Sequence, residues 1–360
     1  MAFDRVREMF ENNMTSGVEV GAAFCAVVDG EVVVDLWDGH ADPAKTRPWD
    51  RDTIVNVYSA TKTITALTML MVADDAAVSF DDPVARYWPE FAANGKQDIT
   101  LAQVMSHSSG LSGWRERLVT EDLYDWEKCT SLLAAQAPLW EPGSASGYHA
   151  VTQGYLIGEV VRRITGDTIG TVFRDRVAVP GGIDFHIGLP ASVDARVAEL
   201  VPPETRPFQD VPLTEIQRIT ADNPPTPVEL TATRAWRAAE IPAGNGHGNA
   251  RSLATALSIL ADGGRDLISE AGVRRALVER SGGTDLMLNV PIRWGLGFAL
   301  GGDFLPNRNT LFWGGLGGSF VVVDLDARAA FAYVMNRMAG DIGDLRGLYL
   351  AMAASEALAR

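Results

Sequence analysis

The chain has 360 residues, a formal net charge of −15 at pH 7, and a composition that is 47% hydrophobic and 21% charged. This composition is that of an ordinary globular protein, which excludes the disordered, collagen-like and disulfide-scaffold classes. The excess of negative charge argues against nucleic-acid binding, and no apolar run reaches the roughly 18–20 residues that a membrane-spanning helix needs.

The first forty residues predict a helix followed by a β-hairpin. Apolar residues recur at helical spacing over residues 3 to about 14. Residues 21–28 and 31–37 are rich in β-forming residues, and they are joined by Asp29-Gly30, a pair that favours a type I′ turn.

The C-terminal end has a similar arrangement. Strands are predicted over residues 319–324 and 329–334, followed by a helix from about 345 to 358. The long stretch between the two ends is mostly helical, with predicted helices over 59–76, 100–107, 129–137, 150–165 and 250–262.

This order of elements predicts an α+β fold, in which one antiparallel sheet is built from both chain ends and flanked by the terminal helices. We expect residues 1–75 and 250–360 to form an α/β lobe, and residues 76–249 to form an inserted, mainly helical lobe. The active site is expected at the interface between the lobes. Seven prolines between residues 202 and 227 predict a long surface excursion.

Ser59 and Lys62 are three residues apart at the start of an apolar helical run, so they share one face of the helix. A lysine buried there can lose its proton, because moving its pKa from ~10.4 to near 7 requires a destabilisation of the ammonium by roughly 4–5 kcal/mol, which a dry cleft can supply. Neutral Lys62 could then take the proton of Ser59 and make it nucleophilic. The alternative is that Ser59 caps the helix and Lys62 is solvated.

Tyr148 follows the Pro142-Gly143 turn and precedes a predicted helix. We expect its phenol to relay a proton between Ser59 and the leaving group, with a pKa lowered by Lys62. The alternative is a tyrosine packed in the core. His149 could act as a base, although a lone histidine is more often a hydrogen-bonded structural residue.

A glycine-rich run, from Phe312 to Phe320, leads into the predicted strand 320–324. Glycines at this position allow another backbone or a substrate to approach closely, although a simple tight turn would have the same composition. A second glycine-rich loop, Ala243 to Ala250, either lines the same cleft or caps the helix that follows it.

Three elements occur in the order Ser59-x-x-Lys62, Tyr148 after Pro-Gly, and Trp313-Gly-Gly315 before a strand. This order resembles that of the serine β-lactamase and penicillin-binding superfamily, and within it the class C-like family VIII carboxylesterases. The resemblance spans residues 20 to 335. It implies a β-lactamase-like fold, with Ser59 as the nucleophile, Lys62 as the general base and Tyr148 as the proton relay. It also implies an oxyanion hole formed by the backbone N–H groups of Ser59 and Leu316.

Two departures from the β-lactamase pattern bear on the substrate. Trp313-Gly-Gly315 stands where those enzymes have Lys-Thr-Gly, and Tyr148-His-Ala150 stands where they have Tyr-x-Asn. A cation that grips the β-lactam carboxylate and an amide that holds the acylamido chain are therefore both missing. We expect hydrolysis of small carboxylic esters with short acyl chains through an acyl-Ser59 intermediate.

Several alternatives remain open. An acyltransferase, a D-amino-acid amidase or a weak β-lactamase would use the same machinery, and a non-catalytic binding or scaffold protein could share the fold. A nucleophile elbow is excluded because no G-x-S-x-G occurs. The residues expected to line the substrate pocket are Trp313, Gly314, Gly315, His149, Trp114 and Trp236.

Neither a metal nor another cofactor is expected. The five histidines form no H-E-x-x-H pattern, and Cys25 and Cys129 have no C-x-x-C partner. The expected partner is a small-molecule ester, without nucleic acid or membrane, and homo-oligomerisation is left open. The N-terminus has no secretory apolar region, so the predicted location is cytoplasmic.

Overall fold

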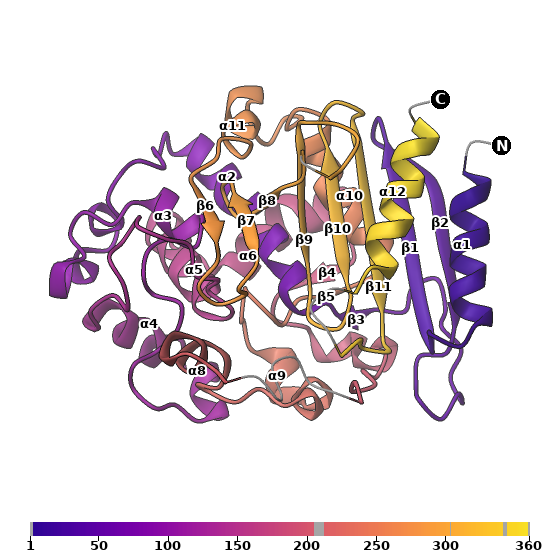
Figure 1. Cartoon of the computed structure of the whole chain (residues 1–360), viewed down its shortest axis with the longest axis horizontal. Helices are drawn as coiled ribbons and strands as arrows, with labels where there is room; N and C mark the ends of the chain where they lie inside the picture. Colours follow the sequence, from indigo (N-terminus) through magenta and orange to yellow (C-terminus); the bar gives the residue numbers. More distant parts are fainter. Residues whose placement is uncertain (1–2, 205–211, 303, 341–343, 359–360) are drawn as a thin grey trace.

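The computed structural model describes residues 3–204, 212–302, 304–340 and 344–358 (Figure 1). Its helices are α1 (Asp4–Thr15), α2 (Thr61–Asp75), α3 (Leu101–Met105), α4 (Trp126–Ala135), α5 (Thr152–Thr165), α6 (Ile169–Phe173), α7 (Val179–Gly181), α8 (Glu215–Ala221), α9 (Arg234–Ala238), α10 (Ala250–Ala261), α11 (Glu270–Arg275) and α12 (Arg346–Leu358). Its strands are β1 (Gly21–Val28), β2 (Glu31–Gly39), β3 (Val55–Asn56), β4 (Phe185–His186), β5 (His247–Gly248), β6 (Ser281–Thr284), β7 (Pro291–Trp294), β8 (Ala299–Leu300), β9 (Thr310–Gly314), β10 (Phe320–Asp324) and β11 (Ala329–Met335).

The main sheet joins the two ends of the chain. It has eight strands in the order β2-β1-β11-β10-β9-β8-β7-β6. The N-terminal strand β1 pairs antiparallel with the last strand, β11, from Ala22 opposite Met335 to Val28 opposite Ala329. The predicted antiparallel sheet built from both chain ends is therefore confirmed, and the N- and C-terminal helices lie near each other (Figure 1).

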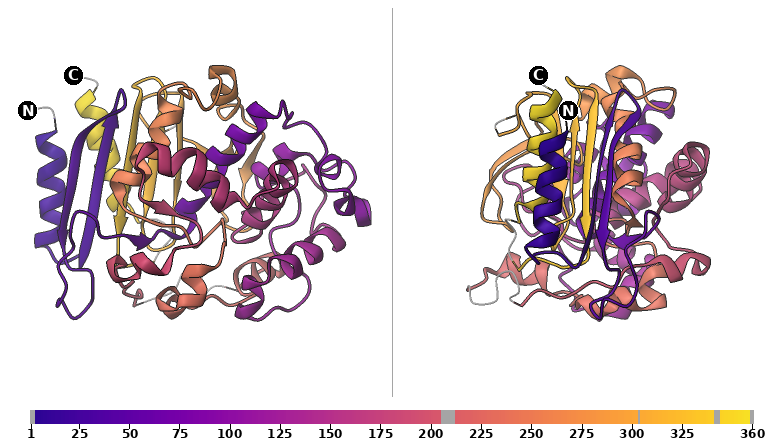
Figure 2. Two further views of the ribbon diagram at one scale, coloured as in Figure 1. Left: turned by 180° about the vertical axis from the view of Figure 1, so that it is seen from behind. Right: turned by 90° about the vertical axis from the view of Figure 1, so that its right-hand side faces the viewer.

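Both faces of the central strands are covered. In β1, Phe24 and its alternate neighbours pack against α1 and α12, whereas Cys25 and its alternate neighbours face the core that contains α10. Figure 2 shows α1 and α12 on one side of the sheet and α10 on the other. Because successive side chains point to opposite faces, a strand buried on both faces needs apolar residues at every position, as β1 has.

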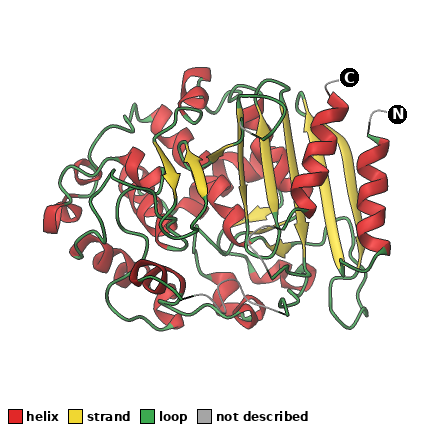
Figure 3. Cartoon of the chain, in the orientation of Figure 1, coloured by secondary structure: helices red, strands yellow, loops and turns green. Residues whose placement is uncertain are grey.

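Most of the helical elements lie between residues 61 and 238, on the far side of the molecule from the terminal helices (Figure 3). Helix α2 is buried from Thr61 to Ala73, which explains why its sequence is almost uncharged all round. The division into two lobes at residues 75/76 and 249/250 stays a prediction. No helix in the described part of the chain is long and apolar enough to cross a membrane.

Parts of the fold differ from the sequence-based expectations. Strands β6, β7 and β8 were not predicted, because they are short and β6 contains two glycines. Trp313 and Gly314 end a strand of their own, β9, instead of merely preceding one. Helix α4 begins at Trp126, three residues before its predicted start.

The proline-rich segment 202–227 is only partly a surface excursion. Residues 205–211 lie outside the described residues. The segment then forms α8, whose Gln217 and Thr220 are buried. The side-chain amide of Asn223 donates to the carbonyls of Trp114 and Glu116 at 2.6 and 2.7 Å, so this end of the segment is packed against the rest of the chain.

Candidate active site

Ser59 lies on a single 3-10 turn, Tyr58–Ala60, between β3 and α2. Tyr58 is buried and has a φ of 44°, a left-handed conformation that non-glycine residues rarely adopt. The chain therefore bends sharply just before Ser59. Ser59 itself is partly exposed, whereas its neighbours Tyr58 and Ala60 are buried.

Lys62 lies one turn further along the same helical segment and is buried. Its Nζ is 3.1 Å from Ser59 Oγ, 2.7 Å from the carbonyl oxygen of Ala150 and 2.8 Å from that of Ala243. Burial lowers the pKa of Lys62 well below its usual value, because the low-polarity surroundings disfavour the ammonium. The structure therefore places a buried amine, with a pKa well below its usual value, next to the serine hydroxyl.

The hydrogen bonds of Lys62 fix the direction of its lone pair. A neutral amine has two N–H donors and one lone pair. The carbonyls of Ala150 and Ala243 are acceptors only, so they take the two N–H groups. Nζ lies within donor distance of Ser59 Oγ as well. Loss of one proton from the amine would leave a lone pair directed at this hydroxyl, which is the arrangement that a general base requires.

Tyr148 completes this group. Its hydroxyl oxygen accepts a hydrogen bond from Trp313 Nε1 at 3.2 Å, and it is also hydrogen-bonded to the Ser59 hydroxyl. The ring centroid lies 4.8 Å from Lys62 Nζ. The structure thus brings Ser59, Lys62, Tyr148 and Trp313 together.

The expectation that Lys62 lowers the pKa of Tyr148 is wrong. Burial raises the pKa of this phenol well above its usual value, and its hydrogen bonds with Ser59 and Trp313 only partly offset that effect. The phenol therefore stays protonated at neutral pH. It can pass a proton on, but it does not serve as a phenolate base.

Gly315 to Ser319 form the turn between β9 and β10, and this turn packs against the segment that leads into Ser59. A Cβ atom on Gly315 would lie 2.1 Å from the carbonyl oxygen of Val57, so only glycine permits this approach. Within the described part of the chain, the backbone N–H groups of Ser59 and Leu316 donate to no carbonyl or side chain. Two unpaired donors on neighbouring segments can together hold a developing oxyanion.

The loop from Ala243 to Ala250 has both of the roles that its sequence allowed. The carbonyl of Ala243 accepts from Lys62, and Asn249 caps α10 by accepting from the backbone N–H of Ser252 at 2.8 Å.

His149 is buried, and both of its ring nitrogens are engaged. Nδ1 lies 2.6 Å from the carbonyl oxygen of Gly147, and Nε2 lies 2.7 Å from Ser109 Oγ. Burial lowers the pKa of His149 to about 4, so the ring is neutral. These contacts give it a structural role in holding the loop beside Tyr148.

The structure does not bring Trp114 or Trp236 to this group. Trp114 packs edge-on against Tyr155 and donates to the carbonyl of Cys129 at 3.0 Å. Trp236 donates to Oδ1 of Asn56, in the strand that precedes Ser59, at 3.1 Å. Among the described residues, neither ring has a hydrogen bond or ring contact with Ser59, Lys62 or Tyr148.

Two residues that lie beside Tyr148 were not predicted as site residues from the sequence. The ring of Trp294 stacks parallel to that of Tyr148, with centroids 6.1 Å apart, and it also contacts Trp313 at 4.6 Å. Asp285 Oδ1 accepts from the backbone N–H of Tyr148 at 3.0 Å. Both come from the β6–β7 hairpin and its turn, which the sequence did not predict.

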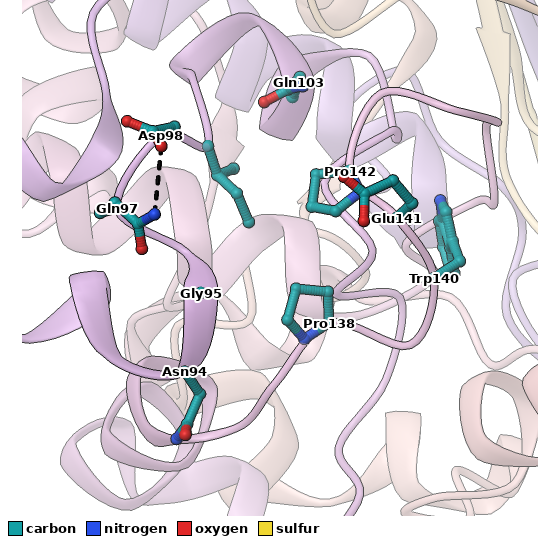
Figure 4. Close-up of a pocket in the computed structure, with 10 residues that line it drawn as sticks. Asn94, Gly95, Gln97, Asp98, Gln103, Pro138, Trp140, Glu141 and Pro142 are labelled. Carbon is teal, nitrogen blue, oxygen red and sulfur yellow. Dashed lines mark hydrogen bonds between the residues drawn. The ribbon is translucent and has the colours of Figure 1, made fainter.

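A separate cavity of about 610 Å³ lies between residues 94–103 and 138–142 (Figure 4). Its lining includes Trp140, Glu141 and Asp98 but none of the residues around Ser59. Within the described ranges, no three His, Cys, Asp or Glu side chains are grouped so that they could hold a metal ion.

Comparison with known proteins gives a consistent result. The Beta-lactamase family model matches residues 6–354. The chain is 34% identical to the esterase/beta-lactamase LipL of Mycobacterium tuberculosis, over 88% of this chain and 77% of that protein. It is also 31% identical to the esterase EstB of Burkholderia gladioli, over 50% of each chain.

Solved structures agree with this result over nearly the whole chain. A family VIII carboxylesterase is 42% identical and superposes with a TM-score of 0.93, covering 99% of this chain and 97% of its own. A penicillin-binding protein homologue from Caulobacter crescentus is 39% identical, with the same TM-score and the same coverage.

Proposed function

This chain belongs to the Beta-lactamase family, as a serine hydrolase of the β-lactamase type, and we propose that it is a carboxylesterase that cleaves small esters through an acyl intermediate on Ser59. Support for ester hydrolysis comes from two relatives, LipL and EstB, which are named as esterases. A structure 42% identical to this chain is described as a family VIII carboxylesterase.

The observation that carries the proposal is a hydrogen-bond chain whose direction is set at both ends. An indole N–H can only donate, so Trp313 makes the hydroxyl oxygen of Tyr148 an acceptor and leaves the phenol proton free to point at Ser59. At the other end, Lys62 Nζ lies 3.1 Å from Ser59 Oγ, and once the amine is neutral its lone pair can accept the proton of Ser59. In that state, donors run from Trp313 through Tyr148 and Ser59 to Lys62.

This direction of the hydrogen bonds allows both proton transfers that ester cleavage requires. As Ser59 Oγ forms a bond to the ester carbonyl carbon, its proton moves to Lys62 Nζ. The carbonyl oxygen becomes an oxyanion held by the N–H groups of Ser59 and Leu316, and such a donor typically contributes about 3–4 kcal/mol to the transition state. When the C–O bond breaks, the alkoxide takes a proton that Tyr148 relays from Lys62.

Hydrolysis of the acyl-enzyme repeats these steps with water as the nucleophile. Water loses a proton to Lys62, its oxygen bonds to the acyl carbon, and the bond to Ser59 Oγ breaks. Ser59 then recovers a proton, and the carboxylic acid leaves. An alcohol in place of water would give acyl transfer by the same route.

We expect a small neutral ester to bind against the wall beside Tyr148. That wall is an apolar cluster in which Tyr148, Met287 and Trp294 are buried, and Phe312 and Trp313 pack against it. An acyl chain gains free energy by leaving water for such a surface. An anionic substrate would find the indole of Trp313 where a cation is needed to hold its charge.

A second candidate activity, β-lactam hydrolysis, is favoured by the name of the relative LipL, which is both an esterase and a β-lactamase. The covalent step would be the same. Because Trp313 carries no positive charge, we expect this activity to be much weaker than ester cleavage.

The test is a panel of p-nitrophenyl esters from acetate to octanoate, assayed beside a chromogenic cephalosporin. We expect turnover of the short esters, an initial burst of p-nitrophenol, and labelling of Ser59 by a phosphonate ester. Ser59→Ala should abolish all three. If the wild-type protein hydrolyses no ester and the phosphonate does not label Ser59, the proposed function is wrong.

A further inference from the structure

The turn Gly315–Ser319, which contains Leu316, contacts the segment before Ser59 on one side. On its other side, it is hydrogen-bonded to residues near the C-terminal end of the chain. Its Gly317 carbonyl accepts two hydrogen bonds, from the backbone N–H of Ala339 at 2.9 Å and from Arg346 Nη2 at 3.1 Å. A Cβ atom on Gly318 would lie 2.1 Å from Asp344 Oδ2. The turn is thus packed between the segment that leads into Ser59 and the start of α12.

Arg346 is itself fixed by two carboxylates. Nη1 donates to Glu19 Oε2 at 2.8 Å, and Nε donates to Asp344 Oδ2 at 2.9 Å. The Glu19 side chain is fully buried, and that of Arg346 is only 13% exposed. Tyr333 donates a further hydrogen bond to Glu19. The guanidinium therefore has a single orientation, in which Nη2 faces the turn.

A buried ion network of this kind is weak evidence for stability, because removing the charges from water costs much of what their attraction returns. The arrangement has a clear geometric effect, however. The rigid planar fork of arginine holds its donors several ångströms apart in fixed directions, so it can bind two carboxylates and a carbonyl on different segments, whereas the donors of lysine all lie on one nitrogen. The carbonyl that it holds belongs to the residue directly after Leu316.

We propose that Arg346 is a positioning residue for the oxyanion hole: it anchors the Gly317 carbonyl and so keeps the N–H of Leu316 aimed at the substrate oxygen. The inference rests on the proposed function, since it assumes that the N–H of Leu316 stabilises an oxyanion. Arg346 does not touch the substrate. It acts through the turn.

The experiment compares Arg346→Ala and Arg346→Lys with a matched control, Arg5→Ala. Arg5 also pairs with a carboxylate on α12, that of Glu356, but makes no contact with the turn. With p-nitrophenyl butyrate, we expect Arg346→Ala to lower kcat about 10- to 100-fold, somewhat less than the ~10²- to 10³-fold loss typical of removing an oxyanion donor. KM should change little, because the oxyanion exists only in the transition state and the intermediate. Arg5→Ala should keep the wild-type kcat.

Two further measurements separate positioning from a loss of folding. Free guanidinium at about 50 mM, far below the molar concentrations that denature proteins, should restore part of kcat to Arg346→Ala, whereas sodium chloride should not. Amide hydrogen exchange at Gly315 to Gly318 should be faster in both Arg346 variants than in Arg5→Ala. Should Arg346→Ala fail to fold, Arg346→Lys carries the kcat and hydrogen-exchange measurements.

The outcomes distinguish this inference from the proposed function. A folded Arg346 variant with wild-type kcat and unchanged exchange in the turn would overturn the inference while leaving ester hydrolysis intact. A loss of kcat that free guanidinium does not restore, with unchanged exchange, would also overturn it. If the wild-type protein itself shows no turnover, the proposed function fails, and the exchange measurement alone then decides whether Arg346 holds the turn.

Discussion

The indole N–H of Trp313 donates to the hydroxyl oxygen of Tyr148 at 3.2 Å, so a residue outside the Ser59–Lys62 pair sets which way the phenol proton points. This hydrogen bond also lowers the pKa of Tyr148, against the larger effect of burial. Trp313 therefore has a chemical role besides its contribution to the apolar wall.

Trp313→Phe keeps an aromatic ring and removes this donor. We expect kcat for p-nitrophenyl butyrate to fall about 2- to 10-fold, which corresponds to the ~0.5–1.5 kcal/mol of one neutral hydrogen bond. The matched control is Trp294→Phe, because the indole N–H of Trp294 has no partner among the described residues. Equal losses in the two variants would show that ring size, and not the hydrogen bond, matters.

Lys62→Arg tests the general base. The guanidinium stays protonated at any working pH, so it cannot take the proton of Ser59, and we expect kcat to fall on the order of 10²- to 10⁴-fold. A near-normal rate at pH 7 would contradict the role of Lys62. In the wild-type protein, kcat/KM should decrease as the pH falls through the lowered pKa of Lys62, because the amine then gains a proton and loses its lone pair.

Tyr148→Phe removes the relay but leaves Lys62 in place. We expect a loss on the order of 10²- to 10⁴-fold for alkyl esters, whose alkoxide leaving groups need a proton. The loss should be much smaller for p-nitrophenyl esters, because p-nitrophenolate leaves without one. The measurement is kcat/KM for both ester types at the same acyl chain. A loss of equal size for both would assign Tyr148 to the attack step instead.

The pairing of Ser59 with Lys62 could be predicted because the 3-10 turn of Ser59 runs directly into the helix of Lys62, and spacing along such a segment determines which side chains meet. The apolar run after Lys62 also indicated its burial. Tyr148 and the Trp313–Gly315 run come from distant segments, and only their order along the chain, through the family resemblance, linked them to Ser59. The close approach of Gly315 to Val57 explains why position 315 needs a glycine. Nothing in the sequence indicated that these two residues would be in contact.

Other features depend on three-dimensional packing that sequence spacing does not encode. Trp114 and Trp236 are chemically suited to a pocket, but each indole N–H is used inside the core. Trp294 lies against Tyr148 because of a hairpin whose first strand, Ser281–Thr284, has no apolar pattern. The raised pKa of Tyr148 follows from burial, which its hydrogen bonds with Ser59 and Trp313 only partly offset.

Glu19 gives a prediction about stability that does not depend on catalysis. Burial raises the pKa of its carboxyl group from 4.5 to about 7, although Arg346, Tyr333 and Arg337 act in the opposite direction and Asp344 adds to the rise. The folded protein therefore keeps this proton at pH values where the unfolded chain has lost it. The resulting stabilisation is fully present below about pH 4.5, and it is lost as the pH rises to about 7.

In the wild type, we therefore expect the free energy of unfolding to decrease by up to about 3 kcal/mol between pH 5 and pH 8, since one pKa unit corresponds to about 1.4 kcal/mol. Glu19→Gln should not show this decrease, because glutamine does not titrate. The measurement is urea unfolding of the wild type and the variant at both pH values. Glu356→Gln, at an exposed carboxylate on α12, is the control and should keep the wild-type pH dependence. If the difference between Glu19→Gln and the wild type is the same at pH 5 and pH 8, Glu19 does not titrate in this range. Its contact with Arg346 would then be an ordinary ion pair at both pH values.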